Sequence, residues 1–114
     1  MGNMGFANWL PKKNHVSGTA RAVAEGWKTI KERNPGMSPS DIANTYVTKR
    51  FMATGNLHLA KEVLHMLRNV NPLNLSWAIL MVENKDECVN LYDRMSKWQR
   101  IMIREIRKYG IDPE

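Results

Sequence analysis

Apolar residues recur every three or four positions along most of this chain, and proline or glycine interrupts the pattern at intervals. This spacing places the apolar side chains on one face of an α-helix, whereas a half-buried strand needs strict alternation. Proline excludes the helical conformation from the residue before it, and glycine permits the turn that ends a helix. The sequence therefore predicts an all-α fold whose helix ends are set by these interruptions.

The interruptions divide the chain into about five helices, over residues 17–34, 38–54, 56–70, 74–84 and 86–109. Ser17, Ser38 and Asn56 are suitable N-caps, because a short polar side chain accepts a hydrogen bond from the first helical turn. Helices joined by short turns pack as stacked antiparallel hairpins. We expect one helical domain over 17–110, an irregular N-terminal arm over 1–16 and a C-terminal tail over 111–114.

The fourth segment differs from the others because it is apolar nearly all round, from Trp77 to Val82. A run of this length also suits a buried strand, but the chain offers no second strand to pair with it. We therefore expect a short, buried helix there. The remaining segments carry apolar stripes that predict their core faces: Val23, Trp27 and Ile30; Ile42, Tyr46, Val47, Phe51 and Met52; Ala60, Val63, Leu64, Leu67 and Val70.

The last segment is predicted to be a long amphipathic helix with a basic polar face. Its apolar residues, among them Trp98, Met102 and Ile106, occupy one side. At about 100° per residue, its cations fall within one opposite arc of roughly 140°: Arg94, Lys97, Arg100, Arg104, Arg107 and Lys108. Such a face favours charge-assisted hydrogen bonds to carboxylate or phosphate. The alternative is a solvated face whose cations stabilise the C-terminal end of the helix dipole.

The whole chain is basic as well. Its 114 residues include 17 lysines and arginines against 11 aspartates and glutamates, a formal net charge of +6. A basic balance favours acidic partners. The sequence therefore predicts a small non-enzymatic interaction module that binds an acidic partner through the basic helix face. A nucleic-acid-binding accessory protein using the same face is the alternative, and a homodimer through the last helix or the segment around Trp9 is a further hypothesis.

A second alternative is a metal-binding helical protein. His58, Glu62 and His65 are spaced to lie on one face of the third predicted helix, and imidazole and carboxylate are ligands for zinc or a similar ion. This face points away from the apolar stripe, so a polar surface is the favoured interpretation and we predict no metal and no cofactor. The sequence contains no glycine-rich phosphate loop or nucleophile elbow, and we predict no catalytic residues.

Cellular location is constrained by two further features. Cys88 is the single cysteine, which excludes an internal disulfide. No apolar run approaches the length of about 20 residues that a membrane-spanning helix needs. We expect a cytoplasmic protein.

Two stretches resemble known helical repeats. The spacing of Val47, Phe51, Gly55, Ala60, Leu64 and Pro72 is similar to that of a tetratricopeptide-type hairpin, and Cys88–Met95 resembles the second helix of a pentatricopeptide unit. The resemblance covers about half of the chain. It implies a helical-hairpin fold that binds a peptide or RNA on a concave face. Generic packing of antiparallel helices is the alternative interpretation.

Overall fold

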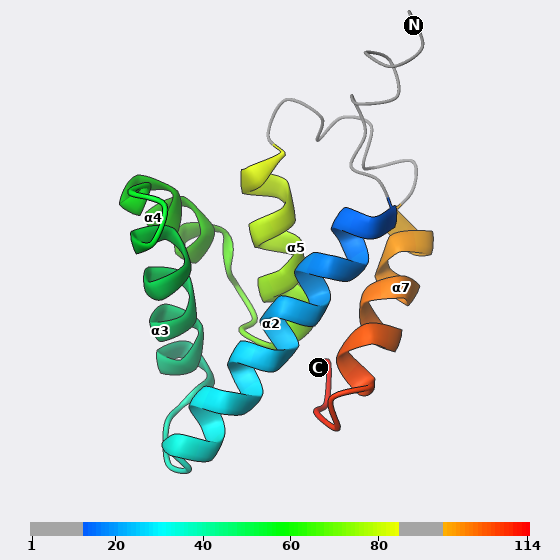
Figure 1. Cartoon of the computed structure of the whole chain (residues 1–114), viewed down its shortest axis with the longest axis horizontal. Coiled ribbons are helices and arrows are strands. Elements are labelled where there is room, and N and C mark those ends of the chain that lie inside the picture. The colour runs from blue at the N-terminus through cyan, green and yellow to red at the C-terminus, as the bar shows by residue number, and fades with distance from the viewer. Residues whose placement is uncertain (1–12, 85–94) are drawn as a thin grey trace, which may run out of the picture.

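Five helices make up the part of the chain that the computed structural model describes, residues 13–84 and 95–114 (Figure 1). They are α2 (Lys13–Arg33), α3 (Pro39–Met52), α4 (Leu57–Met66), α5 (Pro72–Glu83) and α7 (Met95–Arg107). No strand occurs among these residues. The predicted all-α fold is confirmed.

Local capping explains where two of these helices begin. The Ser38 side chain accepts a hydrogen bond from the Asp41 amide at 3.2 Å, and Pro39 stands in the first turn of α3. Asn71 caps α5 in the same way, with 2.7 Å between its Oδ1 and the Asn74 amide nitrogen. Asn56 precedes α4 as predicted, but its side chain makes no capping hydrogen bond.

The first helix begins earlier than the sequence predicts. α2 starts at Lys13 rather than at Ser17, so residues 13–16 of the predicted irregular arm are helical. Val16 is fully buried in a cluster that includes α7 residues. Burial of Val16 therefore outweighs the preference of serine for the helix start. Residues 1–12 lie outside the described residues.

Other helix boundaries differ from the prediction as well: α3 ends at Met52 rather than at residue 54, and α5 begins at Pro72 rather than at residue 74. α4 ends at Met66 rather than near residue 70, because Leu67 has an extended backbone conformation. The described part of the last helix ends at Arg107, two residues before the predicted end, and Gly110 with φ of 75° follows it. The predicted helical residues 86–94 lie outside the described part of the chain, so the continuity of the last helix stays a prediction.

The core consists of two apolar clusters on either side of α2 and α5. The first joins these helices to α3 and α4, and includes Trp27, Phe51 and Ile79. The second joins them to α7, and includes Leu80, Trp98 and Met102. Figure 1 shows α2 crossing between α3 and α7. α5 contributes to both clusters, which explains why its sequence is apolar nearly all round. Its predicted burial is confirmed.

Most of the predicted core faces are correct. Val23, Ile42, Val47 and Val63 are buried in the first cluster. The prediction that Met52 belongs to the core is wrong, because 59% of its surface is exposed where α3 ends. Half-buried positions at the edge of the same cluster are Tyr46, Leu64, Leu67 and Val70.

The predicted C-terminal tail packs against the helices. Ile111 contacts both clusters, and Pro113 is buried. The Pro113 carbonyl oxygen accepts a hydrogen bond from the Leu73 amide at 3.0 Å. This contact satisfies a backbone N–H in the first turn of α5, which has no partner inside its own helix.

A helix that crosses a membrane has to be both long and apolar. Not one of the described helices combines enough length with enough apolar character to cross a bilayer.

Candidate functional site

The solvent-facing side of α7 carries a cluster of cations. Trp98, Met102 and Ile106 are buried against α2 and α5, which turns the opposite side of the helix outward (Figure 1). Arg94 lies outside the described residues. The other predicted partner-binding residues are all exposed, and we refer to them as the basic face: Lys97, Arg100, Arg104, Arg107 and Lys108.

One carboxylate lies at the edge of the basic face. Lys108 Nζ is 3.1 Å from a carboxylate oxygen of Glu105, and Arg21 Nε from α2 is 3.4 Å from the other oxygen. Burial alone would raise the pKa of Glu105, but the hydrogen bond and charge of Lys108, together with Arg21, lower that pKa below its ordinary value. Glu105 therefore stays ionised and ties α7 to α2.

The other four cations of the basic face are differently placed. Within the part of the chain that the structure describes, no carboxylate oxygen lies within 4.0 Å of Lys97, Arg100, Arg104 or Arg107. A depression of about 580 Å³ lies between the last three of these and Lys108, with the half-buried Ile103 as its apolar lining. The face therefore presents forked guanidinium donors around a small apolar patch.

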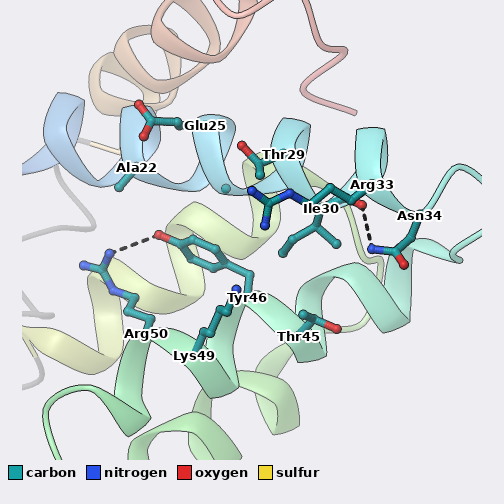
Figure 2. Close-up of a pocket in the computed structure, with 11 residues that line it drawn as sticks. Ala22, Glu25, Thr29, Ile30, Arg33, Asn34, Thr45, Tyr46, Lys49 and Arg50 are labelled. Carbon is teal, nitrogen blue, oxygen red and sulfur yellow. Dashed lines mark hydrogen bonds between the residues drawn. The ribbon is translucent and has the colours of Figure 1, made fainter.

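A second candidate site is a groove of about 560 Å³ between α2 and α3, which we refer to as the α2–α3 groove (Figure 2). Ala22, Gly26 and Ile30 line it from α2, and Tyr46 lines it from α3. Three charged side chains at its rim are exposed: Glu25, Arg33 and Lys49. The groove thus combines an apolar wall with charged edges.

Tyr46 holds the two sides of the groove together. Its ring packs so closely on Gly26 that any larger residue there would overlap it. Its hydroxyl oxygen accepts a hydrogen bond from Arg50 Nη1 at 3.1 Å (Figure 2). Arg50 also forms a forked pair with Glu83 of α5, at 3.0 and 3.1 Å. One arginine therefore links α3 to α5 beside the groove.

The two pKa values in this network shift for different reasons. Burial raises the pKa of the Tyr46 hydroxyl, although the nearby Arg50 charge opposes the shift. Burial would lower the pKa of Arg50, but its interactions with Tyr46 and Glu83 outweigh that effect and raise the pKa. Tyr46 is thus a neutral hydrogen-bond acceptor at neutral pH, and Arg50 is a cation already paired with Glu83.

Sequence reasoning missed this groove. It assigned Tyr46 only to the core and gave no role to Gly26, Arg33 or Lys49. The available signal was Gly26 itself, because a glycine inside a helix has no side chain and leaves room for the close approach of another element.

The three residues of the metal-binding alternative lie on α4. His58 and His65 are exposed on α4, and Glu62 is half-buried. Among the described residues, no group of three or more histidine, cysteine, aspartate or glutamate side chains is arranged to hold a metal ion. The interpretation of this ladder as a polar surface stays a prediction.

No protein-family model, curated protein or solved structure matches this chain. The resemblance to tetratricopeptide and pentatricopeptide hairpins therefore stays a prediction. The two sites have to be interpreted from the chemistry of their own residues.

Proposed function

We propose that this protein is a non-enzymatic interaction module that binds an acidic partner protein through the basic face of α7. The observation that carries the proposal is the exposure of Lys97, Arg100, Arg104 and Arg107 on one helix side, with no carboxylate of the described residues within 4.0 Å. Charge-assisted hydrogen bonds from guanidinium to carboxylate are among the stronger polar contacts in proteins. Binding would therefore replace water around these cations with partner carboxylates.

The lining of the depression favours a protein over a nucleic acid. Ile103 offers an aliphatic surface between the arginines, which suits an apolar side chain flanked by acidic residues. Proteins that bind single-stranded nucleic acid usually add aromatic rings on which bases stack, and none of the described residues that line this depression is aromatic. The partner that fits best is an acidic segment with an apolar anchor.

The same charges disfavour a homodimer through the basic face. A two-fold contact brings the same patch of both copies together, so the exposed arginines of one copy would meet those of the other. Trp98, which could have anchored such a contact, is 5% exposed and belongs to the core. We therefore propose a different molecule as the partner of this face. The segment around Trp9, the other predicted route to a homodimer, lies outside the described residues.

Affinity capture from the native host tests the proposal with a matched pair of variants. R100E/R104E reverses two charges of the basic face, and K61E/R68E makes the same charge change on and just beyond α4, on the other side of the molecule (Figure 1). We expect wild type and K61E/R68E to retain an acidic protein that R100E/R104E loses.

Nuclease treatment of the captured complexes separates the two partner classes. An acidic protein partner should remain bound after all nucleic acid has been digested. If digestion releases everything that depends on Arg100 and Arg104, the face binds nucleic acid and the proposal is wrong. Equal loss in both variants would show an effect of net charge alone, which would also overturn it.

A further inference from the structure

The α2–α3 groove has the dimensions of a small-molecule site. Its volume of about 560 Å³ lies within the range of roughly 300–1,000 Å³ that is typical of ligand pockets. Ala22, Gly26, Ile30 and the half-buried Tyr46 ring supply apolar surface. This surface lies between α2 and α3, whereas the basic face lies on α7, so a ligand here would be independent of the proposed function.

The charges at the rim are arranged unequally along the groove. Arg33 approaches from α2 and Lys49 from α3, on its two sides (Figure 2). Glu25 stands two helical turns before Arg33, about 12 Å away along the axis. Among the described residues, no carboxylate oxygen lies within 4.0 Å of Arg33 or Lys49. The two exposed cations therefore flank the groove from its two sides.

Arg50, the third cation of the lining, has a different role. Its guanidinium is held by the forked pair with Glu83 and by the hydrogen bond to Tyr46. It therefore fixes the Tyr46 ring as a wall of the groove and is already neutralised by Glu83. Charge complementarity with a ligand depends on the two exposed cations, Arg33 and Lys49.

We propose that the α2–α3 groove binds a small carboxylate with an aromatic body. The body lies against Ile30 and the Tyr46 ring, and the carboxylate binds between Arg33 and Lys49. Apolar contact supplies the affinity of such a ligand, and the two cations set its orientation and select for the negative charge.

Titration of 3-phenylpropanoate into ¹⁵N-labelled protein tests this assignment by NMR. We expect saturable shifts of the Gly26, Ile30 and Tyr46 amides. The neutral 3-phenylpropanamide should bind at least about tenfold more weakly, because it keeps the ring and loses the charge. No saturable shift of these amides up to about 20 mM, or equal binding of the two probes, would overturn the proposal.

Two double variants locate the carboxylate. R33Q/K49Q should weaken 3-phenylpropanoate binding by about tenfold or more. K28Q/K31Q removes the same charge from exposed positions of α2 that do not line the groove, and it should bind within about twofold of wild type. Equal weakening by both variants would show binding to the general positive charge and would contradict the site.

Two further controls separate binding in the groove from binding at the basic face and from self-association. R100E/R104E should bind 3-phenylpropanoate as wild type does, so failure of the proposed function would leave this result unaffected. The same groove amides should not shift when protein concentration alone is raised. If they do, a second copy of the chain occupies the groove and the assignment to a small carboxylate is wrong.

Discussion

At the scale of single residues, α2 contains two glycines, Gly18 and Gly26, whose surroundings differ. Both stand inside the helix, where glycine is less favourable than alanine by roughly 0.5–1 kcal/mol. A Cβ added at Gly18 would meet no atom within 4 Å, whereas one added at Gly26 would overlap the Tyr46 ring. Tyr46 cannot move aside freely, because its hydroxyl is bonded to Arg50.

Gly26→Ala should therefore destabilise the protein although it improves helix propensity. Overpacking costs about 1–3 kcal/mol, which the propensity gain of about 0.5–1 kcal/mol offsets only in part, and leaves a net loss of up to about 2.5 kcal/mol. Gly18→Ala is the control, and it should raise the free energy of unfolding by about 0.5–1 kcal/mol. Urea unfolding of both variants measures the difference; equal effects would show that Tyr46 does not pack on Gly26.

Tyr46 should make stability depend on alkaline pH. Its pKa in the folded state is raised above the ordinary value of 10.0, so the unfolded chain loses the phenol proton first as the pH rises. The contribution of the Tyr46 hydroxyl to the free energy of unfolding is complete below about pH 10. It is lost as the pH rises through the pKa of the folded state. Urea unfolding from about pH 8 to about pH 11 should show a steeper loss for wild type than for Tyr46→Phe. Parallel curves would contradict the burial of this hydroxyl.

At the scale of elements, α7 is held by apolar contacts at its buried side and by Glu105 at its edge. Met102 is fully buried between α7 and the central helices, whereas Met52 at the end of α3 is 59% exposed. Met102→Ala should lower the free energy of unfolding by about 2–5 kcal/mol, because it leaves a cavity. Met52→Ala should change it by less than about 0.5 kcal/mol. Thermal or urea unfolding compares the two, and a mild effect at Met102 would show that α7 is not docked as described.

Glu105 should contribute to stability in a way that acid removes. Its pKa in the folded state is lowered below the ordinary value of 4.5, so its contribution is present above that value and is lost as the pH falls through the folded pKa. Glu105→Gln should cost about 0.5–1 kcal/mol at pH 7, a small effect because Arg21 and Lys108 are more than half exposed. The difference from wild type should shrink towards pH 3. A difference that is constant with pH would point to packing rather than charge.

The elements themselves were largely predictable from the sequence. Proline, glycine and the Ser38 cap act locally, so the periodic pattern located every helix that the structure describes. The early start of α2 was not predictable in the same way, because it depends on Val16 meeting α7, a contact between distant segments. The exposed end of α3 at Met52 has the same origin. Such boundaries depend on how helices pack, which a local pattern does not contain.

At the scale of the whole molecule, α2 and α5 separate two clusters and thereby two surfaces. The basic face of α7 was predictable, because helical geometry alone places its cations on one side. The α2–α3 groove was not, since it depends on how closely Gly26 lets α3 approach and on where Arg33 and Lys49 then lie. Sites that belong to one helix can be inferred from periodicity, and sites between helices need the packed structure.

The central claim is that the basic face of α7 binds acidic protein segments, and fluorescence anisotropy with a labelled octaglutamate peptide at low salt tests it most directly. Wild type and K61E/R68E should bind with dissociation constants that agree within about twofold, and R100E/R104E should bind at least about tenfold more weakly. Equal weakening in both variants, or no saturable binding by wild type, would contradict the claim.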